Sequence, residues 1–244
     1  MSCYNTHRLL VALLLAVVIL DSGCRTVSCV EATENWPTYR GVQASGTGSR
    51  GTRLPTTWDL ASGRNIKWQT AIPGLSHASP VIWGDRIYLI TAIDTLGSAE
   101  FRSGVSGDIS SLPQEGPHQW RIYCLDKHTG EIIWDHLGYE GVPRSRRHAK
   151  ASQANSTPAT DGRYVVTFFG SEGLFCYNTE GEQLWFKDLG DLSAGWFRQK
   201  DSQWGFGSSP VIYKDRVIVQ CDSQSQQFIA AFSLATGDEL WRTL

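Results

Sequence analysis

Four tryptophans each end a short segment of the same kind, and this repetition limits the folds open to the chain more than any other feature. The segments read LASGRNIKW, LDKHTGEIIW, YNTEGEQLW and SLATGDELW, and they end at Trp68, Trp134, Trp185 and Trp241. Each has a turn with glycine a few positions before the tryptophan, in most cases with threonine and an acidic residue. Repeated segments of roughly 40 to 50 residues are typical of β-propeller blades.

A second landmark divides each repeat into strands. A small residue followed by proline and an apolar run begins at Ser79, Thr157 and Ser209. A turn, an alternating β-branched run and a further strand follow, and the glycine turn and the tryptophan come last. Proline at a strand start suits an edge position, where the first N–H needs no partner. The sequence therefore predicts an all-β propeller of four-stranded antiparallel blades.

The predicted propeller is incomplete. Whole blades are expected at residues 75–134, 150–185 and 205–241, with an orphan outer strand at 65–70. An insertion at about 93–119 lengthens the first blade and is either a lid over one face or a surface decoration. Propellers close with about four to eight blades. We therefore expect either a part of a longer ring or a ring closed by self-assembly with another copy.

The first 32 residues are predicted to be a signal peptide. A basic start ending at Arg8 precedes an apolar run at residues 9–20, too short to span a bilayer. Cleavage after Ala32 leaves a mature chain with no transmembrane span, either periplasmic or secreted. Gly23-Cys24 resembles a lipoprotein cleavage site, so a lipid anchor on Cys24 is an alternative. The expected division is a signal peptide at 1–32, a lead-in at 33–64 and the partial propeller at 65–244.

Charge and cysteine content exclude several classes of function. A net charge of -2 provides no overall attraction to nucleic acid or to an anionic membrane. Export leaves Cys124, Cys176 and Cys221, of which the first two fall at the same repeat position. We expect buried thiols inside strands rather than a disulfide. No cysteine and histidine spacing typical of a metal site is present, and no catalytic residue is predicted.

These segments resemble the PQQ-like β-propeller repeat family. The match rests on the tryptophan-docking motif of quinoprotein dehydrogenases, Ala-x-Asp-x-x-Thr-Gly-acid-x-x-Trp, which occurs here twice at that length and once one residue shorter. The lead-in at residues 35–41 also resembles the start of exported planctomycete-type members. The structural docking residues that the resemblance implies are Trp68, Trp134, Trp185 and Trp241, with Gly130, Gly181 and Gly237.

The resemblance implies two different functions. Members of the family include dehydrogenases that use pyrrolo-quinoline quinone (PQQ) with Ca2+, and non-catalytic scaffolds such as the lipoprotein of the outer-membrane β-barrel assembly machinery. The dehydrogenases stack a vicinal cysteine pair on the quinone, and this chain has no adjacent cysteines. We therefore expect a non-catalytic binding or scaffold module of the cell envelope, holding an envelope protein or a small ligand in the channel. A quinoprotein dehydrogenase is the alternative.

Candidate ligand contacts come from the loops that enter the inner strands, because these loops line the mouth of a propeller channel. His77, Gln153 and Asn155 offer hydrogen bonds there, and Trp204 offers a stacking face. Together they would form a polar, aromatic-walled funnel. Ordinary turn chemistry explains the same residue types, because asparagine, serine and glycine also begin strands.

A basic cluster at residues 144–150 directly precedes the second predicted blade. Its Arg146 and Arg147 would hold a carboxylated ligand, such as a tricarboxylic quinone, or an acidic partner. A solvated loop with scattered counterions is the other interpretation.

Overall fold

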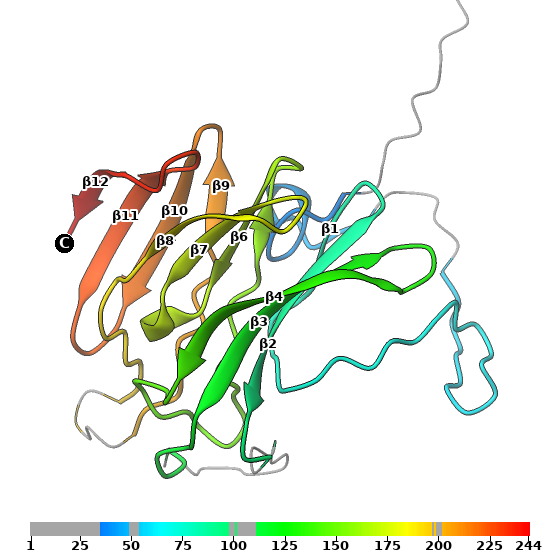
Figure 1. Cartoon of the computed structure of the whole chain (residues 1–244), viewed down its shortest axis with the longest axis horizontal. Helices are drawn as coiled ribbons and strands as arrows, with labels where there is room; N and C mark the ends of the chain where they lie inside the picture. The colour runs from blue at the N-terminus through cyan, green and yellow to red at the C-terminus, as the bar shows by residue number, and fades with distance from the viewer. Residues whose placement is uncertain (1–34, 49–53, 98–100, 102–110, 197, 199–201) are drawn as a thin grey trace, which may run out of the picture. The chain divides into compact units, whose positions relative to one another are not determined.

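The computed structural model describes residues 35–48, 54–97, 101, 111–196, 198 and 202–244 (Figure 1). The chain divides into the units Met1–Ala32 and Thr33–Leu244, and all described residues belong to the second. The predicted signal peptide and Cys24 lie outside them. No helix in this described part is both long and apolar enough to cross a membrane.

Three four-stranded antiparallel sheets make up the second unit, and in each sheet the strands follow chain order (Figure 1). Sheet 1 contains β1 (Val81–Trp83), β2 (Arg86–Asp94), β3 (His118–Asp126) and β4 (Ile132–Gly141). Sheet 2 contains β5 (Ala159–Thr160), β6 (Tyr164–Phe168), β7 (Leu174–Asn178) and β8 (Gln183–Lys187). Sheet 3 contains β9 (Val211–Tyr213), β10 (Arg216–Asp222), β11 (Gln227–Ser233) and β12 (Glu239–Thr243). The predicted fold of propeller-like blades is confirmed.

The register shows that the sequence repeats are also structural repeats. The residue pairs that align at the tryptophan are Cys124 with Trp134, Cys176 with Trp185, and Ala231 with Trp241. In all three sheets the register shifts directly after this pair. The shift has the form of a β-bulge, in which an extra residue increases the local twist of the outer strand. The tryptophan therefore leaves each sheet in the same direction.

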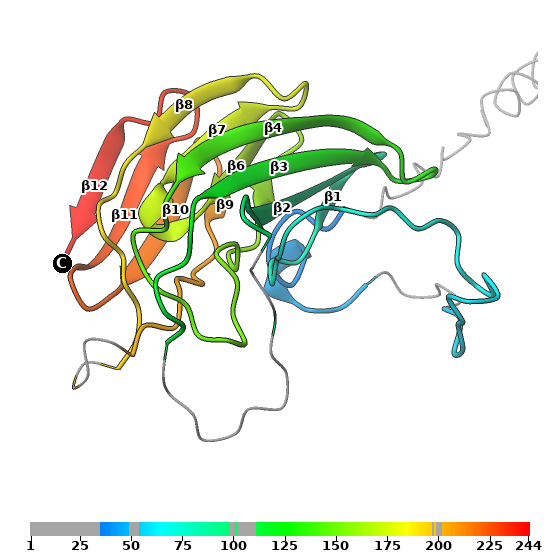
Figure 2. The same ribbon diagram turned by 60° about the horizontal axis from the view of Figure 1, so that its bottom comes forward.

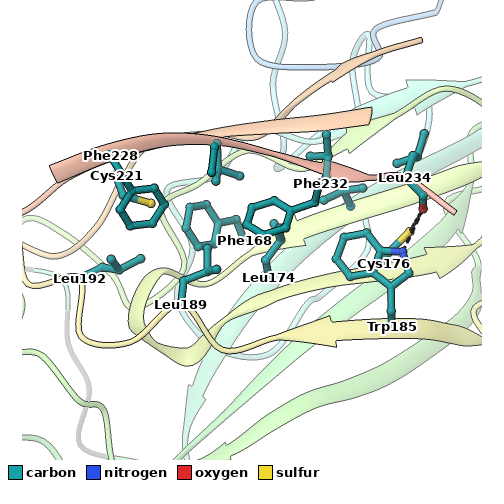
Figure 3. Packing of buried hydrophobic residues seen from close by; sticks show 14 of the residues in the cluster. Phe168, Leu174, Cys176, Trp185, Leu189, Leu192, Cys221, Phe228, Phe232 and Leu234 are labelled. Atoms are coloured by element: carbon teal, nitrogen blue, oxygen red, sulfur yellow. Dashed lines mark hydrogen bonds between the residues drawn. The ribbon is translucent and has the colours of Figure 1, made fainter. Parts of the chain in front are cut away.

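The sheets lie side by side, as Figure 2 shows, and apolar side chains fill the space between them. Trp120 and Ile122 of sheet 1 belong to one buried cluster with Phe175 of sheet 2. Figure 3 shows the next cluster, in which Phe168 of sheet 2 faces Phe232 of sheet 3. The two clusters lie on opposite faces of sheet 2, so both faces of this sheet are buried.

An equivalent hydrogen bond joins three of the four repeat tryptophans to the next sheet. The indole Nε1 donates to the carbonyl oxygen of the residue that begins the glycine turn. The pairs are Trp68 with Lys127 (2.9 Å), Trp134 with Thr179 (3.1 Å) and Trp185 with Leu234 (2.9 Å). Trp241 is 39% exposed and has no following sheet among the described residues.

Glycine is required under each of these rings. A Cβ atom added to Gly130 would lie 2.4 Å from the ring of Trp68, and one added to Gly237 would lie 2.8 Å from the ring of Trp185. Both glycines also have a positive φ, of 75° and 72°, which side chains disfavour. Gly181 has a φ of 91° and would meet His136 and Trp134 in the same way.

The small residues before the prolines form a second link between sheets, at their inner strands. The backbone N–H of Ser79 donates to Thr157 Oγ1 at 3.0 Å, and the N–H of Thr157 donates to Ser209 Oγ at 2.9 Å. Each hydroxyl therefore accepts a hydrogen bond from the residue that directly precedes the proline of the preceding sheet. This role explains why the position requires serine or threonine.

Two predicted elements differ from the structure. Residues 65–70 carry no strand, although Trp68 and Thr70 do contact the turn of sheet 1, where Thr70 Oγ1 donates to Gly130 O at 2.6 Å. A strand needs a neighbouring edge for its hydrogen bonds, and no described segment supplies that edge. The insertion is shorter than predicted, because β2 continues to Asp94 and β3 begins at His118.

Replacing Trp185 by alanine should lower the free energy of unfolding by about 3–5 kcal/mol, because a buried ring and its hydrogen bond are lost. The matched change Trp241→Ala removes the same ring from a partly exposed position. It should cost less than about 1 kcal/mol. Urea denaturation followed by circular dichroism measures both. Equal losses would show that docking on the next sheet does not stabilise the chain.

Candidate functional site

A cavity of about 870 Å3 lies beside the inner strands β5 and β9. Its walls come from the lead-in, from the loops before the inner strands and from the strands themselves. The lining residues are Pro37, Thr38, Tyr39, Val42, Gln43, Ala44, His77, Asn155, Thr157, Ala159, Thr160, Gly207, Ser208, Ser209, Val211, Ile212 and Tyr213. None of them is an aspartate, glutamate, lysine or arginine. The cavity therefore suits an uncharged ligand, because a charged group would lose its hydration without a charged partner.

The lead-in wall is held in place by backbone pairing. Trp36 forms an antiparallel bridge with Ile82 of β1, with N–H to oxygen distances of 2.8 and 2.9 Å. One residue later, Pro37 O accepts the N–H of Thr160 at 2.8 Å. The chain then turns at Gly41, where the ring of Trp36 occupies the space of a Cβ, and forms a 3-10 turn at Val42–Ala44.

The opposite wall is held together by the loops that precede the inner strands. The backbone N–H of His77 donates to Ala154 O at 3.0 Å. The side chain of Asn155 joins two loops, because Oδ1 accepts from the N–H and the hydroxyl of Ser152 while Nδ2 donates to Phe206 O. The imidazole of His77 is exposed and lies 5.2 Å from the ring of Phe101. Desolvation, and next the charge of Arg147, lower the pKa of His77.

A buried ion pair lies away from the cavity lining. The Arg147 guanidinium, 1% exposed, contacts both carboxylate oxygens of Glu115, and its shortest contact is 2.6 Å. It also donates to Ala151 O at 2.7 Å, and the amide of Gln153 donates to Glu115 at 3.1 Å. This network joins the end of the insertion to the loop before sheet 2.

Glu172 is a second buried carboxyl group, 2% exposed. Its Oε1 accepts the backbone N–H of Arg144 at 2.9 Å. Burial raises the pKa of Glu172 to about 7, and the hydrogen bond from Arg144 opposes this rise only in part. The Arg144 side chain instead forms a bidentate pair with Asp188, at 2.8 and 2.9 Å.

The residues present do not fit PQQ with Ca2+. Calcium binds oxygen ligands that include carboxylates, and a tricarboxylic quinone needs cationic partners. The cavity lining provides neither. Across the described residues, no group of three or more histidine, cysteine, aspartate or glutamate side chains is placed to hold a metal. The thiols of Cys124, Cys176 and Cys221 are buried in three different sheets, and burial raises the pKa of each to about 12.

Comparison with known families supports the repeat assignment. A family model described as outer membrane protein assembly factor BamB matches residues 118–244. The chain belongs to this PQQ-like β-propeller repeat family. The match begins at β3 and extends through sheets 2 and 3. No curated protein matches the chain.

Three solved structures similar to this PQQ-like repeat chain are larger than it. A europium-containing methanol dehydrogenase has 13% identity and a TM-score of 0.48, over 87% of this chain and 32% of its own. The quinohemoprotein alcohol dehydrogenase of Comamonas testosteroni has 17% identity and a TM-score of 0.46, over 86% and 27%. BamB from Moraxella catarrhalis has 17% identity and a TM-score of 0.36, over 73% and 54%. The chain therefore spans about a third or less of both dehydrogenases and about half of BamB.

The sequence-predicted ligand residues of the PQQ-like repeat chain fall into different environments. His77 and Asn155 line the cavity. Gln153 and Arg147 belong to the buried network with Glu115. Trp204, 40% exposed, and Arg146, partly buried, lie outside the cavity lining. Ligand binding by these six residues stays a prediction.

Sequence reasoning did not identify the lead-in or the predicted strand β9 as walls of a cavity, and it gave no role to the acids Glu115 and Glu172. The lead-in motif at residues 35–41 was a usable signal, since its residues supply part of the lining. The two acids carry no sequence signal. Only the tertiary structure brings Glu115 to Arg147 and buries Glu172.

Replacing Arg147 by methionine should lower the free energy of unfolding by about 3–5 kcal/mol, because the Glu115 carboxylate loses its buried charged partner. The neighbouring change Arg146→Met is the matched control and should cost less than about 0.5 kcal/mol. Guanidinium chloride is unsuitable for this charged pair, so urea denaturation at pH 7 is the measurement. Similar losses in both variants would contradict a structural role specific to Arg147.

The free energy of unfolding should fall as pH rises from 4.5, the ordinary pKa of a glutamate, to about 7. In this window the folded chain holds a proton on Glu172 that the unfolded chain has released, so raising the pH favours unfolding. The contribution is about 2–3 kcal/mol and should disappear in Glu172→Gln. Urea denaturation at pH 5 and pH 8 measures the difference between the two proteins. The exposed change Glu140→Gln is the control and should leave the slope unchanged.

Proposed function

We propose that this chain is a non-catalytic binding module of the cell envelope, exported by its N-terminal segment, that holds an uncharged part of a partner in the cavity beside β5 and β9. The observation that carries the proposal is the lining of this cavity. The cavity has a volume within the range of ligand sites in proteins. It also lacks the charged side chains on which catalysis with a metal or an anionic cofactor would depend.

The rim of the cavity has the character of a binding surface. Tyr39 is 56% exposed and Tyr213 is 57% exposed, and Val42 and Val211 are about half exposed. Tyrosine provides a large apolar face and a polar hydroxyl, which is why it is common where proteins bind partners. The walls are held by backbone hydrogen bonds on the lead-in side and by Asn155 on the other. Binding would therefore require little reorganisation of the protein.

Membership of the family supports a scaffold role, because the matching family model is that of an outer membrane protein assembly factor. The quinoprotein alternative lacks support from the cavity residues. An experiment on the full chain can separate the scaffold from the dehydrogenase, because a scaffold requires a partner protein and a quinoprotein dehydrogenase requires PQQ and Ca2+.

A photo-crosslinking amino acid at Tyr213 should capture a partner in cells that export the chain. The same amino acid at Trp58, which is 67% exposed and lies outside the cavity lining, is the matched control and should capture much less. The purified chain with PQQ, Ca2+ and an alcohol should not reduce an electron-acceptor dye. Dye reduction that requires both additions, or equal capture from Trp58, would overturn the proposed function.

A further inference from the structure

Three equivalent residues present backbone groups at the inner edges of the three sheets. These are the second residues after each proline, namely Ile82, Thr160 and Ile212. In sheet 1 Ile82 pairs with Ile87, one position from the hairpin pair Trp83 with Arg86. In sheet 3, Ile212 pairs with Val217 at the equivalent position, next to the hairpin pair of Tyr213 with Arg216. Hydrogen bonding alternates along an antiparallel pair, so these residues direct their N–H and C=O away from the sheet.

The lead-in of the same chain already uses two of these edges. Trp36 makes both possible bonds with Ile82, and the N–H of Thr160 donates to Pro37. The inner edge thus accepts an extended, uncharged segment as an added strand. This contact within the chain shows what the edge binds, namely the backbone N–H and C=O groups of an extended segment.

The third edge is open. Among the described residues, no backbone group bonds to Ile212 on this side. Its neighbours Val211 and Tyr213 are 48% and 57% exposed. The side chain of Ile212 packs against the cluster between sheets 2 and 3, so the strand itself is held in place. All three residues of β9 line the cavity.

We propose that an extended, uncharged peptide segment of a partner protein adds to the inner edge of β9 and pairs with Ile212, as Trp36 pairs with Ile82. The inference rests on the proposed function and specifies its partner. An unpaired strand edge is a template for a further strand, and backbone bonds then supply affinity while pockets select alternate side chains. The cavity of about 870 Å3 accommodates the side chains on one face of such a segment. Tyr39 and Val42 on the lead-in wall favour apolar or aromatic residues there.

The test uses a displayed library of random nine-residue peptides, selected on the full chain and counter-selected on an unrelated protein. The strongest peptide is then synthesised, and its affinity is measured by fluorescence anisotropy. Ile212→Pro removes the outward N–H, whereas Ile212→Ala shortens the side chain but keeps the N–H. We expect the proline variant to bind about tenfold more weakly than the alanine variant. Circular dichroism checks that both variants keep their sheets.

A second measurement does not depend on the folding of a variant. N-methylation of the peptide backbone at successive positions should weaken binding about tenfold at the pairing residue and much less at its two neighbours, because donors alternate along a strand. Equal effects at all positions, or equal binding by the two Ile212 variants, would overturn strand addition. Either result would leave the proposed function standing if Tyr213 still captures a partner. Failure to select any peptide would also overturn the inference, whereas dye reduction with PQQ and Ca2+ would overturn the proposed function itself.

Discussion

The contact of each tryptophan ring with the glycine turn of the next sheet is the interaction on which the rest of the structure depends. A single repeat cannot bury its hydrophobic face alone, so the core forms only where neighbouring sheets stack. The ring and its Nε1 hydrogen bond fix the position of one sheet against the next, as Trp134 and Trp185 do. The bulge after the tryptophan pair sets the direction of the ring. Replacement of the glycine by any other residue would put a Cβ only 2.4 to 2.9 Å from atoms of the tryptophan ring, which is too close for a normal contact.

A second set of contacts at the inner strands explains why the cavity lies where it does. The hydroxyls of Thr157 and Ser209 hold the inner strands of adjacent sheets near one another. Outer and inner contacts together leave the inner edges facing a common space, because every sheet presents the same edge. The lead-in covers the edge of β1 and reaches β5. The remaining edge, that of β9, borders the cavity, so the position of this candidate binding site follows from how the repeats are stacked.

Sequence reasoning succeeded where the chain repeats and was weaker where it does not. The strands, the turns and the role of Gly130 could be predicted because the same local pattern occurs in every sheet, and each copy supports the others. The orphan strand at 65–70 failed as a strand because pairing depends on an edge that the segment does not contain. Four of the six candidate ligand residues shared a loop position in the repeat, yet the structure separates His77 and Asn155 from Gln153, which joins Arg147 in the network around Glu115.

By itself, the sequence determined the all-β blades and the tryptophan and glycine spacing, since these depend on local periodicity. The tertiary structure alone decided which polar groups are available. Glu115 neutralises Arg147, and Asn155 holds two loops together. Burial raises the pKa of Glu172, and the open edge at Ile212 exists only because the lead-in ends its pairing at sheet 2. Such properties arise from contacts between residues far apart in the chain, which no local pattern encodes.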